Sequence, residues 1–141
     1  MAYVVPRLVR PEHLNGAGTI FGGTLLAWID EAAAIAAMKK VKSPRIATVA
    51  MSEIQFKRPV REGSLVLIHV SIVAIGRTSI TLRACADTHD SRRPVIIVER
   101  ITFVSLDKHG HPFPHRLATR ESVEKKKAKQ YPVRLVTKKP Q

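Results

Sequence analysis

Residues 24–40, TLLAWIDEAAAIAAMKK, constrain the fold more than any other segment of this chain. The run contains neither Gly nor Pro and is rich in Ala and Leu, so it predicts a helix. Its apolar residues lie on nearly every face of that helix, which is typical of a buried helix rather than a surface helix. Ser43 and Pro44 predict where the helix ends. The rest of the chain must therefore supply a layer that covers this helix.

The residues after Pro44 change to a two-residue periodicity and are rich in Val, Ile and Thr, which predicts β-strands. The connections are too short for parallel crossovers, so the strands must form an antiparallel meander or a close variant. Near the N-terminus, an apolar stretch interrupted by Pro6 predicts an edge strand, because proline cannot donate a ladder hydrogen bond. We expect an α+β fold in which an antiparallel sheet of about five or six strands wraps the long helix. The predicted strands are residues 4–9, 46–55, 65–74, 79–86 and 94–104.

The length of 141 residues predicts one domain, because it suffices for one core but not for two. We place this domain at residues 1–118 and predict that residues 119–141 form a basic C-terminal helix or tail. The formal net charge of +13 favours a polyanionic partner, such as nucleic acid, a membrane surface or a phosphorylated ligand, although a solvated basic tail also accounts for much of it. Aromatic residues are not interleaved with the basic ones, so we expect no nucleic-acid partner.

Several other classes of protein are disfavoured by the sequence. No apolar run approaches the roughly 20 residues of a membrane span, and the first residues lack the apolar core of a secretory signal, so we expect a cytoplasmic protein. The single cysteine, Cys85, lies in a strand pattern and is more typical of a core thiol than of a nucleophile. His109, His111 and His115 lack the nearby Cys or acidic partners of a closed zinc site, so we expect no metal.

Asp30 is the most unusual residue of the predicted helix, because an acid among apolar and small residues is costly to bury unless it is paired or has a task. Pairing with Arg or Lys would give it a structural role. Gly22 and Gly23 leave the helix start without side chains, so its backbone amides could polarise a carbonyl oxygen; close backbone packing would explain these glycines equally well. Two helical turns separate Gly22 from Asp30, so a site that used both would need two chains.

Two motifs resemble those of one enzyme family. The run H-x-N-x-x-G-x-x-F-G-G at residues 13–23, followed by W-I-D-E-A-A at residues 28–33, is similar to the acyl-CoA thioesterases of the hotdog superfamily, particularly the bacterial YciA-type enzymes and the mammalian cytosolic acyl-CoA hydrolases. The turn after the second strand, at residues 54–63, and the Gly-x-Thr-Ser hairpin, at residues 76–79, resemble the same family. The likeness covers residues 9–114, which is most of the chain.

The resemblance implies a hotdog fold and a catalytic set of four residues. Asp30 matches the family's helix aspartate, considered either a general base that activates water or a nucleophile that forms a transient anhydride. Asn15 matches the loop asparagine that positions water or the thioester, and Gly22 and Gly23 match the glycines whose amides polarise the carbonyl. In this family the loop and glycines of one protomer face the aspartate of the other. Thr19 departs from the pattern, because many YciA-type sequences have an acid there, which could alter substrate preference.

We therefore expect an acyl-CoA thioesterase that hydrolyses an acyl-CoA to a free acid and coenzyme A without a cofactor. A homodimer is the minimal unit, and related enzymes often assemble further into tetramers or hexamers. The phosphates of coenzyme A give the positive charge a use. The main alternative is a non-catalytic acyl-CoA-binding hotdog protein, which would not need Asp30. The residues expected to bind coenzyme A are Arg58, Gly76, Arg77, Thr78 and Ser79.

Overall fold

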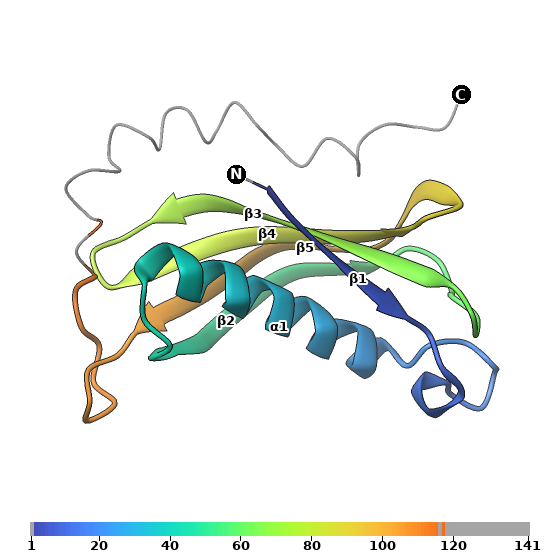
Figure 1. Cartoon of the computed structure of the whole chain (residues 1–141), viewed down its shortest axis with the longest axis horizontal. Helices are drawn as coiled ribbons and strands as arrows, with labels where there is room; N and C mark the ends of the chain where they lie inside the picture. The colour runs from blue at the N-terminus through green and yellow to red at the C-terminus, as the bar shows by residue number, and fades with distance from the viewer. Residues whose placement is uncertain (1, 116, 118–141) are drawn as a thin grey trace.

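The computed structural model describes residues 2–115 and 117, which form an α+β fold with a single long helix on a five-stranded antiparallel sheet (Figure 1). The predicted α+β arrangement is therefore confirmed. The predicted C-terminal segment, residues 119–141, lies outside the described residues. No helix in the described part of the chain is long and apolar enough to cross a membrane. The elements are β1 (Ala2–Leu8), a short 3-10 helix η1 (Pro11–His13), α1 (Gly22–Val41), β2 (Ile46–Phe56), β3 (Leu65–Ile75), β4 (Ser79–Thr88) and β5 (Ser91–Ser105).

The strand order in the sheet is β1-β3-β4-β5-β2, which differs from a simple meander. β3, β4 and β5 are consecutive neighbours, as expected, but β2 lies at the far edge beside β5 instead of pairing with β3. The connection at residues 57–64 makes this crossing possible, because its backbone is held in place as it passes the start of α1. Val60 accepts a hydrogen bond of 2.8 Å from the Ile20 amide, and Ser64 accepts one of 3.0 Å from the Val9 amide.

α1 packs along one face of the sheet and buries a single side of its surface in one chain (Figure 1). Leu25 and Ile29 are fully buried against sheet residues such as Ile68 and Leu82. The helix ends at Lys42, which adopts the left-handed conformation with φ 56° and donates its amide to the Met38 carbonyl. The opposite side of α1 remains partly open, so the burial on all sides that the apolar pattern predicts is not achieved by one chain alone.

β2 forms an exposed edge of the sheet. It pairs with β5 on one side only, and its register shifts between Thr48 and Ala50. Glu53, within the same strand, has a φ of 54°, which adds a local twist. Val49 and Phe56 leave more than half of their surface exposed, at 57% and 55%. An edge strand with exposed apolar side chains is a common place for another chain to pair.

Candidate active site

Asp30 lies in the third turn of α1, next to the edge strand β2. The Thr48 hydroxyl donates a hydrogen bond of 2.8 Å to Oδ1 of Asp30. Asp30 is half-buried, and no basic side chain among the described residues forms an ion pair with it. The adjacent acid, Glu31, differs because it pairs with Arg7 at 3.1 Å. The salt bridge that would give Asp30 a purely structural role is therefore absent from the described part of the chain.

The two glycines that begin α1 have different surroundings. A methyl group at Gly22 would lie 3.1 Å from the Phe56 ring, whereas one at Gly23 would meet nothing within 4 Å. Gly22 also lines a cavity of about 390 Å³. Phe21, which precedes the helix, provides no side-chain cap, and no hydrogen bond among the described residues uses either glycine amide. Close packing thus accounts for Gly22, whereas no atom of the described chain occupies the space beside the Cα atom of Gly23.

Asn15 shapes the loop that leads into α1. Its side-chain oxygen accepts hydrogen bonds from the amides of Ala17, at 2.9 Å, and Thr19, at 3.2 Å. Its side-chain nitrogen donates to the Thr19 hydroxyl at 3.1 Å. The loop is tied to the helix start because the Phe21 amide donates to the His13 carbonyl at 2.9 Å. Asn15 therefore has a structural role in this loop, and one of its two side-chain N–H groups remains for a ligand.

Asp30 and the glycine amides do not form one site within a single chain. Eight residues separate Gly22 from Asp30, which corresponds to about 12 Å along the helix axis. This separation exceeds the reach of a base and an oxyanion donor that act on the same carbonyl group.

Arg58 lies beside Gly22, because both residues line the cavity at the start of α1. Its guanidinium donates to the Thr88 hydroxyl at 2.7 Å and to the Arg93 carbonyl at 3.0 Å. These bonds fix the guanidinium against the turn between β4 and β5. Arg58 still has N–H groups left for a phosphate, since a guanidinium carries five donors.

The hairpin at residues 76–79 lies at the other end of the sheet from Arg58. β4 joins these two ends, and its ten residues span roughly 30 Å. The backbone of the hairpin is well anchored, because the Ser105 amide donates to the Thr78 carbonyl at 2.7 Å and the Gly76 amide donates to the Ser79 carbonyl at 2.9 Å. A methyl group on Gly76 would contact the Ser79 hydroxyl, so Ser79 would have to change its side-chain rotamer to accept it. Arg77 is exposed. The residues predicted to bind coenzyme A are thus divided between the two ends of one chain.

Other titratable groups lie away from Asp30. His69 and Asp87 form a buried pair, with 3.0 Å between Nε2 and Oδ1. They alternate with core residues of β3 and β4, so they face the side of the sheet that α1 does not cover. Burial raises the pKa of the Cys85 thiol to about 12, which makes it a poor nucleophile. Among residues 2–115 and 117, no three His, Cys, Asp or Glu side chains gather as a metal site would require.

Thr48 and Phe56 are the two site residues that the sequence pattern did not indicate. Thr48 orients Asp30, and the Phe56 ring packs against Gly22. Both belong to β2, and their contacts depend on how this strand is placed beside α1. A threonine and an aromatic residue are ordinary in a strand, so no feature of the sequence marked either of them as a site residue.

Comparisons with known proteins give this geometry a family. A family model described as the thioesterase superfamily matches residues 17–95, which is more than half of the chain. The chain is 35% identical to the acyl-CoA thioester hydrolase YciA of Escherichia coli over 115 residues, which cover 77% of this chain and 86% of that protein.

Two solved structures are similar over nearly the whole chain. A hexameric hotdog fold thioesterase of Campylobacter jejuni is 30% identical, with a TM-score of 0.70, and the match covers 90% of this chain and 95% of that chain. An acyl-CoA hydrolase from Staphylococcus aureus, solved with butyryl coenzyme A and coenzyme A, is 27% identical, with a TM-score of 0.71 and coverage of 92% and 85%. The resemblance that the sequence motifs indicate is therefore confirmed, as is the hotdog fold. The chain belongs to the thioesterase superfamily, as a hotdog-fold thioester hydrolase.

Proposed function

We propose that the protein hydrolyses acyl-CoA thioesters at a site shared by two chains. Asp30 of one protomer removes a proton from water, and the water oxygen attacks the thioester carbonyl carbon. The amides of Gly22 and Gly23 from the other protomer hold the carbonyl oxygen while it gains negative charge. The carbon–sulfur bond then breaks, the sulfur takes the proton, and a free acid and coenzyme A leave. This reaction needs no cofactor.

One observation carries this proposal: Asp30 and Gly22, which both belong to α1, lie against β2 at two different points of that strand. Thr48 holds Asp30 near one end of the strand, and Phe56 packs on Gly22 at the other end. Antiparallel pairing of two β2 strands, centred near Ser52, would bring Thr48 of each chain opposite Phe56 of the other. Asp30 of each protomer would then face the glycine amides of the other, and the separation of about 12 Å within one chain would no longer matter.

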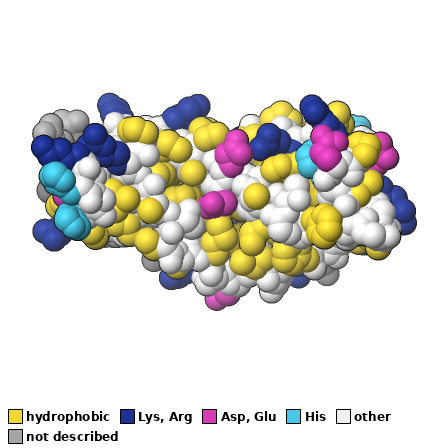
Figure 2. Space-filling view, turned by 90° about the horizontal axis from the view of Figure 1, so that it is seen from below, with side chains coloured by type: hydrophobic (Ala, Val, Ile, Leu, Met, Phe, Trp, Pro, Cys, Tyr) yellow, Lys and Arg dark blue, Asp and Glu magenta, His cyan; other side chains and the backbone are white. Residues whose placement is uncertain are grey.

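Apolar surface around β2 and α1 supports this pairing. Figure 2 shows hydrophobic side chains over much of the face that carries α1, with Lys and Arg along its edges and at both ends. The large exposed apolar residues on this side have 38–57% of their surface open in one chain. A second protomer would cover them, as a stable interface requires. These residues are Phe21, Ile35, Val49 and Phe56.

The same pairing would reunite the residues expected to bind coenzyme A. Arg58 follows the end of β2, and Arg45 precedes its start. In an antiparallel pair, the end of one β2 lies beside the start of the other. Arg58 of one protomer would therefore approach the end of the partner that holds Arg77 and its hairpin, where phosphates could bind between the two chains.

The relatives support the substrate and the assembly. The Staphylococcus aureus hydrolase was solved with butyryl coenzyme A, and the Campylobacter jejuni thioesterase is hexameric. We propose a dimer as the catalytic unit and a hexamer of three such dimers as the assembly in the cytoplasm.

Release of free thiol from a series of acyl-CoA substrates tests the proposed activity. We expect turnover by the wild-type protein and a loss of about 10² to 10⁴-fold in kcat for Asp30→Asn, with the fold intact. Near-normal turnover by a folded Asp30→Asn variant would exclude this role of Asp30. Tight acyl-CoA binding without any thiol release would favour the non-catalytic alternative.

A further inference from the structure

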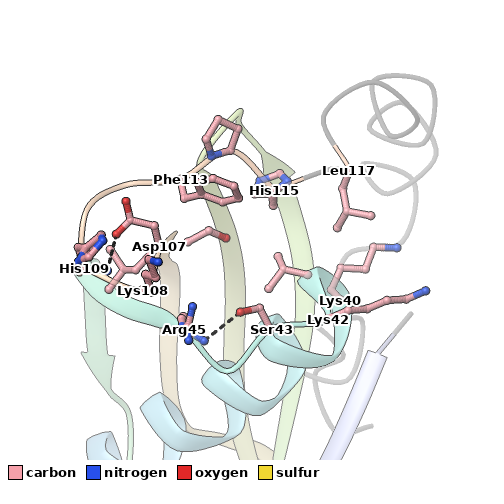
Figure 3. A pocket seen from close by; sticks show the side chains of 14 residues that line it. Lys40, Lys42, Ser43, Arg45, Asp107, Lys108, His109, Phe113, His115 and Leu117 are labelled. Carbon is pink, nitrogen blue, oxygen red and sulfur yellow. Dashed lines mark hydrogen bonds between the residues drawn. The ribbon is translucent and has the colours of Figure 1, made fainter.

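Three large apolar side chains among the described residues are exposed outside the surface that we assign to the dimer: those of Val4, Leu8 and Phe113. Phe113 belongs to the wall of a cavity at the C-terminal end of α1 (Figure 3). Val4 and Leu8 both lie on β1 and have 54% and 49% of their surface open. These two side chains therefore mark a second apolar surface, at a strand that takes no part in the proposed pairing of β2.

Val4 and Leu8 lie on the face of the sheet that α1 does not cover. Tyr3 and Val5, which alternate with them along β1, pack against the core on the other face. Residues that stand opposite each other in an antiparallel pair share a face, so the β3 partners of Leu8 and of Pro6 lie on the same side as Val4. We call this set the β1 surface, and it consists of Val4, Pro6, Leu8, Leu65 and Leu67.

The β1 surface can contact an identical surface without like-charge repulsion, because none of its five side chains carries a charge. His69, which stands opposite Val4, is buried and paired with Asp87 at 3.0 Å. Pro6 has no N–H group and lies in an edge strand, where proline disfavours the addition of another strand. The β1 surface is therefore suited to contact through side chains, which would bury its apolar area.

The strand order places β1 and β2 at opposite edges of the sheet (Figure 1). When two β2 strands pair, the sheet continues through both chains, and a β1 strand forms each of its two ends. Each dimer thus carries two copies of the β1 surface, one at each end. A dimer with two such surfaces can contact two neighbours, and three dimers can close a ring in which every β1 surface is covered.

We infer that the β1 surface binds the β1 surface of another dimer, and that these contacts join three dimers into a hexamer. The inference rests on the proposed function, since it takes the β2-paired dimer and the hexamer from there. The contact is isologous, because both chains present the same side chains across a two-fold axis. The catalytic sites lie between β2-paired chains, so the second contact adds no residue to them.

Size-exclusion chromatography with light scattering tests this inference. The wild-type protein should have six times the 15.7 kDa mass of one chain. Val4→Glu/Leu8→Glu should have the mass of two chains, because each contact would otherwise bury four carboxylates without cationic partners. The matched control, Phe113→Glu, adds a carboxylate at an exposed apolar residue outside the β1 surface and should keep six chains. The milder variant Leu8→Gln should separate into dimers at higher protein concentrations than the wild type, and it serves if two added charges prevent folding.

Thiol release separates the inference from the proposed activity. Val4→Glu/Leu8→Glu should keep the kcat per chain of the wild type, since the two chains that share each site remain paired. Six chains in the wild type and two in the double variant, without thiol release from either, would support the inference and count against the activity. The inference is overturned if the folded double variant and Leu8→Gln both assemble like the wild type, if the double variant separates into single chains, or if the wild type contains fewer than six chains.

Discussion

The hydrogen bond from Thr48 to Asp30 gives the first prediction, at the scale of single residues. If this bond orients the catalytic carboxylate, Thr48→Val should lower kcat about tenfold, because a hydrogen bond to a charged group contributes about 1.5–3 kcal/mol and water can replace part of it. Steady-state kinetics of thiol release measures the change. KM should remain close to that of the wild type, since Thr48 touches the acid rather than the substrate.

Thr81→Val is the matched control for this variant. It also removes a strand hydroxyl, one that lies 3.0 Å from the Thr102 hydroxyl and forms no hydrogen bond with the described residues of α1. We expect kcat of Thr81→Val to equal that of the wild type. Equal activities of Thr48→Val and wild type would show that Asp30 needs no such support.

Single residues differ in how far their roles could be predicted from the sequence. Asp30 stands out in the sequence because an acid is unusual in an Ala-rich helix. Since two helical turns separate it from the glycines, the sequence also predicted that a site using both would need two chains. Asn15 was identified only by resemblance, and its hydrogen bonds within the loop show a structural task that a motif does not reveal.

The start of α1 allows a matched pair of substitutions at the scale of elements. Gly23→Ala should raise the free energy of unfolding by about 0.5–1 kcal/mol, because Ala favours a helix and the added methyl meets nothing. The same methyl should lower kcat/KM, since it occupies the space through which a carbonyl oxygen would reach the amide. Gly22→Ala should lower stability, because the Phe56 ring must move. Urea unfolding and thiol-release kinetics together measure both effects, and a fully active, stabilised Gly23→Ala variant would contradict the role of this amide.

A cross-strand ion pair between β4 and β5 predicts a pH effect on stability. Arg83 donates two hydrogen bonds to Glu99, at 2.7 Å and 3.0 Å, and these bonds lower the pKa of the Glu99 carboxyl. Because this pKa is lower in the folded chain than in the unfolded chain, the pair stabilises the fold above the usual glutamate pKa of about 4.3. The stabilisation is lost as the pH falls through the lowered folded pKa.

Glu99→Gln isolates this contribution. The variant should have a lower free energy of unfolding than the wild type at pH 7, by about 1 kcal/mol or less, since the pair is partly exposed. The difference should shrink as the pH falls through the lowered folded pKa, because the wild-type carboxyl then becomes protonated as well. A difference of the same size at neutral and at acid pH would show that the ionised pair is not its source.

The elements themselves could be predicted well from local patterns, but their order in the sheet could not. Every predicted strand is present, with ends that differ by three residues or fewer, because strand formation follows from β-branched residues between turns. The position of β2 beside β5 depends on long-range contacts of the connection at residues 57–64, and no local pattern encodes these. The contact between Thr48 and Asp30 depends on this position of β2, so it could not be predicted from the sequence either.

At the scale of the whole molecule, the proposed pairing of two β2 strands predicts one specific cross-link. Ser52→Cys should place two thiols close together across the two-fold axis, so a short thiol-reactive cross-linker should join two chains. Gln55→Cys is the control, because its two copies would lie roughly 20 Å apart along the paired strands. The native thiol of Cys85 should not interfere, since it is buried and its pKa is raised to about 12. Gel electrophoresis under denaturing conditions measures the result, and equal cross-linking of the two variants would exclude this register.

Mixed assemblies of two inactive variants test the shared site most directly. Asp30→Asn lacks the acid, and Gly23→Val blocks the open amide, so each variant alone should release little thiol. When the two are co-expressed in equal amounts and pair at random, half of the dimers contain both chains, and one of the two sites in each of these dimers is intact. Thiol release should therefore recover to about a quarter of the wild-type rate. If the mixture stays as inactive as its components while mass spectrometry shows that mixed dimers have formed, the acid and the amides do not act across two chains.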